Sequence, residues 1–246
     1  MLLCPRCQQP LPEPPARFCP HCGAEVPPAT SGTPWERRDR IGFLAGLVET
    51  TQQVFSRPAE FFRGMPVTGG LGGPLLYGVA VGYVGLLASA VYNATFQALV
   101  GPELFGLSRR GELERLLPYL QGGLGLAMQL ILGPLLIAIG LFIFAAIVHL
   151  LLMLLGGAPR GFEATFRVGC YAEAAALLRV IPFCGSLLSA ACFLFFAIIG
   201  LSEAHGISKG RAAVAVLLPL LLACCCCAAA IALVVGGFAS ALGQLK

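Results

Sequence analysis

Four cysteines near the start of the chain have the spacing of a metal site. Cys4 and Cys7 form one Cys-x2-Cys pair, and Cys19 and Cys22 form a second pair after eleven intervening residues. Each pair can present two thiolates from one tight turn, which is how proteins hold a tetrahedral zinc ion. Gly23 follows the second pair and permits the tight backbone of such a turn. We therefore predict one structural zinc ion bound by these four cysteines, because a closed Cys4 site leaves no open position for a reacting water.

Two other interpretations of the cysteines stay open. They could belong to a disordered, proline-rich tail, or one pair could act as a redox dithiol. The presence of two properly spaced pairs favours a metal site over both. A domain of about 25 residues cannot bury a core of its own, so bound zinc would supply its folding free energy. We expect residues 1–25 to form a zinc ribbon and residues 26–33 to form a flexible linker.

Polar residues inside long apolar runs are the second set of candidates, because a charge at the centre of a bilayer costs about 2.5–3.5 kcal/mol. Glu173 could meet His149 of the preceding apolar run and form a proton relay. A structural hydrogen bond, or a neutral Glu173, is the preferred interpretation because transporters usually contain more such groups. Arg179 is close enough to Pro182 to extend to the interface, and Asn93 is expected to hydrogen-bond between helices.

The composition places these residues in a membrane protein. Of the 246 residues, 57% are hydrophobic and 11% are charged, against about 25% charged in soluble domains. About 20 apolar residues cross a bilayer as a helix. The sequence contains five such segments, at roughly residues 74–100, 124–155, 162–181, 183–201 and 212–242. We predict an all-α polytopic membrane protein with a five-helix transmembrane bundle in residues 67–246.

Two details of the apolar segments bear on how they fold. The second and fifth segments contain Pro134 and Pro219, and we expect each segment to be one long helix, kinked or overhanging, rather than two spans. Gly78 and Gly82 in the first segment form a small-xxx-small pair that permits close helix contact. With 31 glycines in the chain, chance matches to that motif are common.

Residues 34–66 have the pattern of amphipathic helices lying on the membrane surface. Thr33 is a candidate N-cap, with Pro34 at the first helical position and Glu36 three residues after the cap. Arginines at the start of this helix interact unfavourably with the positive end of the helix dipole. Anionic lipid headgroups would offset that repulsion. Packing against the protein's own domain is the alternative, because periodicity does not distinguish the two. The residues expected at the membrane interface are Arg37, Arg38, Arg40, Phe61 and Phe62.

The distribution of positive charge predicts the orientation. With five spans, eleven Lys and Arg residues lie on or near the side of the N-terminus and four on the opposite side. Cytoplasmic loops carry the excess of positive charge, so we expect the N-terminus in the cytoplasm and the C-terminus across the cell membrane. Thiolates stay reduced in the cytoplasm, which agrees with a zinc site there.

Several segments of the membrane part carry a family pattern. They are "ETTQQVFSRPAEFFRGM", "GGPLLYG" and the run from Ala164 to Pro219, including Tyr171, Pro182 and Gly185. Through these segments, the chain resembles the bacterial branch of the Yip domain family of Ypt/Rab-interacting proteins. The resemblance covers roughly residues 40–240. The resemblance implies five spanning helices and a cytoplasmic N-terminus. Eukaryotic members bind Rab-type GTPases in vesicle trafficking, but their acidic Asp-Leu-Tyr-Gly-Pro motif is absent here. Residues 4–23 resemble the zinc-ribbon heads of bacterial membrane proteins.

These observations favour an integral membrane scaffold or adaptor that presents a cytoplasmic zinc ribbon to an unidentified protein partner, with a role in membrane organisation or trafficking. The alternative is a small transporter or channel that uses Glu173 and His149. A membrane enzyme is least expected, because the membrane part has only two histidines, His149 and His205, and the chain has no HExxH motif. The absence of a basic stripe with base-reading partners argues against nucleic acid. The partners expected are the lipid bilayer and the cytoplasmic protein, and a homo-oligomer stays open.

Overall fold

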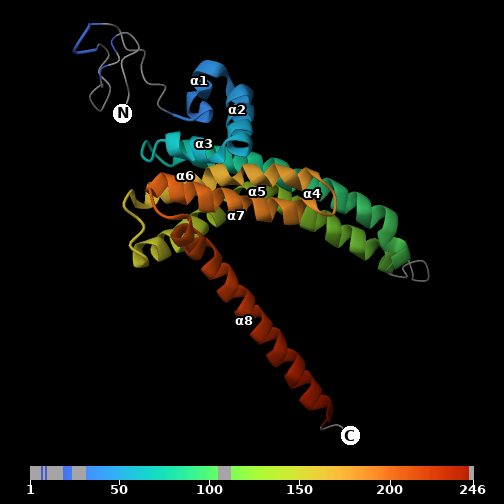
Figure 1. Cartoon of the computed structure of the whole chain (residues 1–246). Helices are drawn as coiled ribbons and strands as arrows, with labels where there is room; N and C mark the ends of the chain where they lie inside the picture. Colours follow the sequence, from blue (N-terminus) through green and yellow to red (C-terminus); the bar gives the residue numbers. More distant parts are fainter. Residues whose placement is uncertain (1–6, 8, 10–18, 24–31, 105–111, 244–246) are drawn as a thin grey trace.

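The computed structural model describes residues 7, 9, 19–23, 32–104 and 112–243 of the chain (Figure 1). All secondary structure in these ranges is helical. In chain order the elements are η1 (Pro34–Arg37), α1 (Arg38–Ile41), α2 (Phe43–Ser56), α3 (Pro58–Gly64), α4 (Gly72–Leu104), α5 (Glu112–Leu154), α6 (Gly161–Ala172), η3 (Glu173–Val180), α7 (Gly185–His205) and α8 (Lys209–Gly243). The elements η1 and η3 are 3-10 helices.

Four helices are long and apolar enough to cross a membrane. The candidate spans are Gly72–Phe96, Gly125–Leu154, Gly185–His205 and Lys209–Ala229. They overlap the first, second, fourth and fifth apolar segments of the sequence. Pro134 and Pro219 lie inside the continuous helices α5 and α8, so the prediction of one long helix for each of these two segments is confirmed.

The prediction of a third spanning helix, and with it a five-helix bundle, is not confirmed. Residues 162–181 fold as the 12-residue α6 followed by the 8-residue 3-10 helix η3, and this segment is not among the four candidate spans in the described part of the chain. It contains Glu163, Arg167, Glu173 and Arg179, whereas the other four apolar segments contain no acidic or basic side chain apart from His149.

The α6–η3 segment is the central element of the bundle. Residues 164–176 are all buried, because α4, α5 and α7 pack against this segment. Protein rather than lipid therefore surrounds Arg167 and Glu173. Gly78 and Gly82 of α4 face it, and a Cβ atom on Gly78 would lie 3.1 Å from the carbonyl oxygen of Cys170. The small-xxx-small pair of the sequence is thus a real close contact.

Four short helices precede the bundle, and we call η1, α1, α2 and α3 the head. Thr33 caps η1, Pro34 occupies the first turn and Glu36 completes a capping box, as predicted. Arg57 separates α2 from α3, which begins at Pro58. The proline has no N–H to donate, so the first turn of a helix is its natural place.

The head packs on the bundle instead of lying wholly on a membrane surface. Trp35 and Val54 are completely buried in the main core, and α3 contacts α7. Phe61 and Phe62 are 7% and 0% exposed. The prediction that these two residues lie at the membrane interface is therefore wrong, because their rings fill the seam between the head and the bundle.

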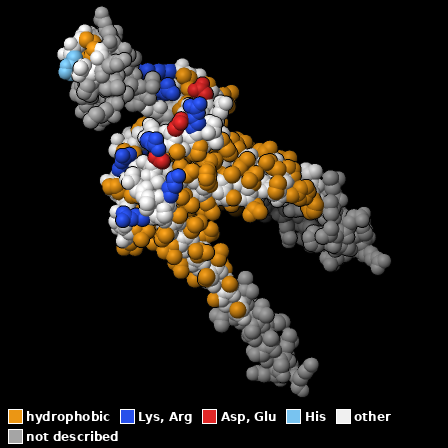
Figure 2. Space-filling view, viewed as in Figure 1, with side chains coloured by type: hydrophobic (Ala, Val, Ile, Leu, Met, Phe, Trp, Pro, Cys, Tyr) orange, Lys and Arg blue, Asp and Glu red, His pale blue; other side chains and the backbone are white. Residues whose placement is uncertain are grey.

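Among the described residues, charged side chains gather at one end of the molecule. Figure 2 shows them around the head and the neighbouring turns, whereas hydrophobic side chains cover most of the described surface of the long helices. The α5–α6 and α7–α8 turns lie at this end, and α8 leaves it at an angle to the other long helices (Figure 1). We call it the charged end. Its exposed basic residues are Arg40, Arg57, Arg63, Arg160, Lys209 and Arg211.

Candidate functional site

Three of the four predicted zinc ligands lie together. The Sγ atoms of Cys7, Cys19 and Cys22 are within 4.8 Å of one another, and those of Cys7 and Cys19 are 3.7 Å apart. Four sulfur atoms at about 2.3 Å from a tetrahedral zinc ion would be separated by about 3.8 Å. The donor type and the spacing therefore fit zinc. Cys4 lies outside the described residues.

The backbone around the second cysteine pair explains this arrangement. Residues 20–22 form a turn, and the amide of Gly23 donates a hydrogen bond of 2.9 Å to the carbonyl oxygen of Cys19. Gly23 has a φ of 65°, a left-handed conformation that glycine adopts without strain. The turn brings Cys22 back toward Cys19, which is only 2% exposed.

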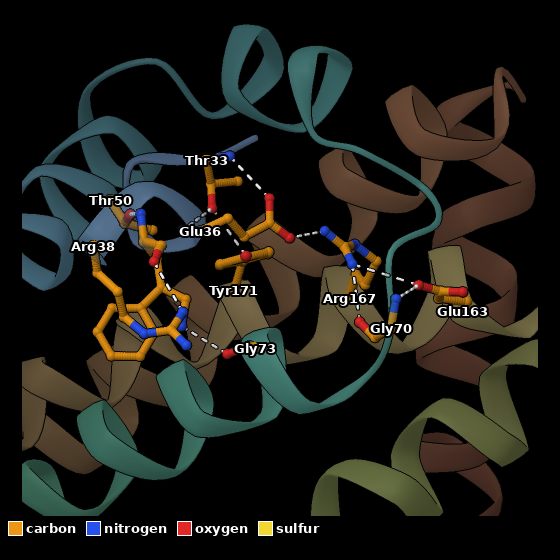
Figure 3. Close-up of polar contacts among 10 residues, drawn as sticks. Thr33, Glu36, Arg38, Thr50, Gly70, Gly73, Glu163, Arg167 and Tyr171 are labelled. Atoms are coloured by element: carbon orange, nitrogen blue, oxygen red, sulfur yellow. Dashed lines mark hydrogen bonds and ion pairs between the residues drawn. The ribbon is translucent and has the colours of Figure 1, made fainter. Parts of the chain in front are cut away.

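A buried polar network joins the head to the central α6 helix (Figure 3). Arg167 of α6 is 1% exposed. Its guanidinium donates to the carboxylate of Glu36 in η1 and, over 3.0 Å, to the carbonyl oxygen of Gly70. The second oxygen of Glu36 accepts from the amide of Thr33 at 3.0 Å. The hydroxyl groups of Thr33 and Tyr171 lie 2.9 Å apart, which adds a second link to α6.

Trp35 fixes the head to the start of α4. Its indole N–H donates to the carbonyl oxygen of Gly73 at 2.6 Å, and its backbone N–H donates to the hydroxyl of Thr50 in α2 at 2.8 Å. The guanidinium of Arg38 lies 4.8 Å from the centre of the indole ring, within the range of a cation–π contact. Because buried donors and acceptors are costly to leave unpaired, these bonds hold η1, α2 and α4 in one arrangement.

The three arginines predicted at the membrane interface differ in exposure. Arg38 is half-buried against Trp35. Arg37 is also half-buried, and its Nε atom is buried without a hydrogen-bond partner in the described part of the chain. Arg40 is exposed. Of the three, Arg40 alone is fully available to a lipid headgroup.

A second buried cluster lies where α5, α6 and α7 meet. The hydroxyl of Thr165 is 2.9 Å from Nδ1 of His149 and 2.9 Å from Nε2 of His205. All three side chains are buried. A threonine hydroxyl carries one hydrogen and can accept as well as donate, so it can donate to one imidazole and accept from the other. The cluster thereby joins three helices of the bundle.

The proposed pairing of His149 with Glu173 is not formed. His149 bonds to Thr165, and Glu173 follows eight residues later, about 12 Å further along a helix. The Glu173 carboxylate lies beside Gly82 of α4. Arg179 is half-buried near the end of η3.

Asn93 does not make the predicted bond between helices. It is exposed on α4 and has no hydrogen-bond partner among the residues that the structure describes. It borders a cleft of about 320 Å³ between α4 and the turn before α7, lined by Tyr92, Asn93, Phe96, Pro182, Phe183 and Ser186.

Sequence reasoning missed the Arg167 network and the Thr165 cluster. A signal for the first was present: Glu163 and Arg167 stand four residues apart in an otherwise apolar run, the spacing of an ion pair on one helix face. Nη1 of Arg167 and Oε1 of Glu163 are 3.5 Å apart, and the same carboxylate oxygen accepts a hydrogen bond of 2.7 Å from the amide of Gly70. Thr165 is an unremarkable residue in the sequence, and no local pattern marks its partners.

Comparison with known proteins gives one family match. The model of the Yip1 domain family matches residues 53–238, which run from α2 to α8 and include α6, η3 and the Thr165 cluster. The match excludes the cysteine turn and η1. No curated protein and no solved structure matches the chain.

Proposed function

The chain belongs to the Yip1 domain family of membrane proteins, and on this premise we propose that it is an integral membrane scaffold with a zinc-binding head. In this proposal Cys4, Cys7, Cys19 and Cys22 bind one zinc ion, and the folded turn offers a docking surface to a cytoplasmic protein. The separation of 3.7 Å between the sulfur atoms of Cys7 and Cys19 carries the proposal, because it matches the edge of a zinc–thiolate tetrahedron.

The role of the zinc ion would be structural. Thiolate ligands alone complete a tetrahedral shell, so the metal would bind no substrate. Zinc binding would instead fold a segment that is too short to bury a core. A small folded module on a membrane anchor would be suited to docking.

Charge supports the proposed side of the membrane. Among the described residues, exposed basic side chains gather at the charged end, where the head lies. By the positive-inside rule, such an end would face the cytoplasm. The proposed orientation puts the cysteines in a reducing compartment, where they stay available to metal.

Metal analysis of the purified full-length chain is the first test. We expect one zinc per chain in the wild type and none in the variant Cys19→Ser/Cys22→Ser. Cys192→Ser is the matched control, because Cys192 is half-buried in α7 and should not alter the zinc content. A variant that retains its zinc would contradict the proposal.

Cross-linking in native membranes then tests the scaffold role. Partners that co-purify with the wild type and the Cys192→Ser control, but not with Cys19→Ser/Cys22→Ser, would identify what the zinc module docks. The double variant alone could lose zinc while all three samples keep the same partners. That result would show that the zinc module does not bind these partners.

A transporter that uses Glu173 and His149 is less well supported, because the two residues have separate surroundings. The transporter hypothesis predicts a pH-dependent flux of solute into proteoliposomes, and it predicts that Glu173→Gln abolishes this flux. Unchanged flux in this variant would remove the second candidate function.

A further inference from the structure

Helix α2 presents three chemically different sides. One side is buried through Gly46, Thr50 and Val54: Gly46 and Thr50 lie against η1 and α1, and Val54 belongs to the main core. A second side is apolar and exposed: Leu44, Val48 and Phe55 are 74%, 57% and 38% exposed. Residues of an α-helix are about 100° apart around its axis, which places these three side chains within a sector of about 40°. We call this the apolar flank of α2.

The third side of α2 is polar and exposed. Its residues are Glu49, Gln52, Gln53 and Ser56. A helix packed on a soluble protein would be polar over all of its exposed surface. Here the exposed surface is divided lengthwise into an apolar flank and a polar flank. This division is typical of a helix at the boundary between hydrocarbon and water.

The apolar flank continues into the surface of one candidate span, α7. The ring of Phe55 packs edge-on against Phe196 of α7, with 5.1 Å between centroids. Phe196 contacts Phe195 at 5.7 Å, and Phe195 is 54% exposed on the outside of α7. The apolar flank therefore merges with a surface that lipid must cover if α7 crosses the bilayer.

A polar contact also joins α2 to a second candidate span, because the hydroxyl of Thr51 in α2 lies 2.7 Å from that of Tyr77 in α4.

We propose that α2 lies in the interfacial layer of the bilayer, with Leu44, Val48 and Phe55 in contact with lipid acyl chains. Glu49 and Gln53 then face headgroups and water. The bilayer is the occupant because the flank is continuous with the outer surface of α7. The exposed Arg40, just before α2, is placed to meet anionic lipid phosphates. This contact goes beyond the scaffold function and does not depend on zinc.

Tryptophan fluorescence in nanodiscs tests the placement. Trp35 is the single tryptophan of the chain and is 0% exposed, so the wild type supplies a shielded background. The two variants are Leu44→Trp on the apolar flank and Gln53→Trp on the polar flank, about 180° apart around the helix. Both positions are exposed, so neither substitution disturbs the core.

We expect lipids with brominated acyl chains to quench the added emission of Leu44→Trp and aqueous iodide to leave it unchanged. Gln53→Trp should lose its added emission to iodide and not to the brominated chains. Iodide quenching of Leu44→Trp would overturn the proposal, because the flank would then face water. Protection of Leu44→Trp from both quenchers would also overturn it, because a second copy or another protein would then cover the flank. Unchanged unfolding temperatures verify that both variants fold.

Discussion

Arg167 is a cation that the fold removes almost entirely from water. Its partners are the carboxylate of Glu36, the carbonyl oxygen of Gly70 and, at 3.5 Å, the carboxylate of Glu163. The variant Arg167→Met leaves Glu36 without its counter-charge in a mostly buried place. Breaking a buried ion pair from one side costs about 3–5 kcal/mol, so we expect a loss of this size in the free energy of unfolding. Denaturant titration of the full chain in mild detergent measures it.

The pair Arg57–Glu60 is the control for this prediction. Its side chains are 73% and 69% exposed, so water already screens the charges, and Arg57→Gln should cost less than about 1 kcal/mol. If Arg167→Met and Arg57→Gln lowered stability equally, the network of Figure 3 would not hold the head in place.

Thr165 is the only polar link between His149 and His205 among the contacts that the structure describes. The variant Thr165→Val has nearly the same shape but no hydroxyl, so one nitrogen of each imidazole is left unpaired inside the protein. Each such loss costs about 1–3 kcal/mol. We expect a clear fall in the unfolding temperature for Thr165→Val and a small one for Thr165→Ser, which retains the hydroxyl. Equal effects of the two substitutions would mean that packing of the methyl group, rather than hydrogen bonding, matters here.

The contact between α4 and η3 depends on the absence of side chains at its tightest point. A Cβ atom on Gly85 would overlap the carbonyl oxygen of Ala176, so Gly85→Ala must push the two helices apart. Overpacking of this kind costs about 1–3 kcal/mol. Gly140→Ala is the control, because a Cβ atom there would meet nothing within 4 Å and alanine favours a helix by about 1 kcal/mol over glycine. Thermal unfolding should separate the two variants, and similar curves would contradict the close contact.

The helices of the bundle differ in how far sequence could predict them. The elements α4, α5, α7 and α8 each contain a long apolar run in which His149 is the only acidic or basic residue, and length with hydropathy locates them. The α6–η3 segment carries four charges in a short run, and its form depends on neighbours that shield it. In the head, periodicity identifies amphipathic helices but not what covers each side. It could not decide that Phe62 faces protein while Leu44 faces outward.

The same limit applies to the candidate sites. The cysteine pairs are local, so their spacing in the sequence already predicts a metal turn. Glu36 and Arg167 are 131 residues apart, and Thr165 and His205 are 40 apart. A single sequence contains no information on which distant residues meet, so the polar links between elements emerge only when the chain is folded.

At the scale of the whole molecule, the α6–η3 segment determines how many times the chain crosses the membrane. α5 ends at the charged end, α7 returns to it, and α6–η3 runs between them alongside α7 (Figure 1). Twelve α-helical residues and eight 3-10 residues extend about 34 Å at rises of 1.5 and 2.0 Å per residue. The hydrocarbon core of a bilayer is about 30 Å thick. The segment is therefore long enough to cross, although it is not a single α-helix.

We expect the two ends of the chain to lie on opposite sides of the membrane, because four candidate spans and one composite crossing make an odd number. Reporter fusions to each end measure this: a fluorescent protein that matures only in the cytoplasm, and an alkaline phosphatase that is active only outside it. The N-terminal fusion should fluoresce, and the C-terminal fusion should show phosphatase activity. If both ends report the cytoplasm, the number of crossings is even and the expectation of five crossings is wrong. A further fusion within residues 182–184, before α7, then distinguishes the cases, since a true crossing puts this turn outside the cytoplasm.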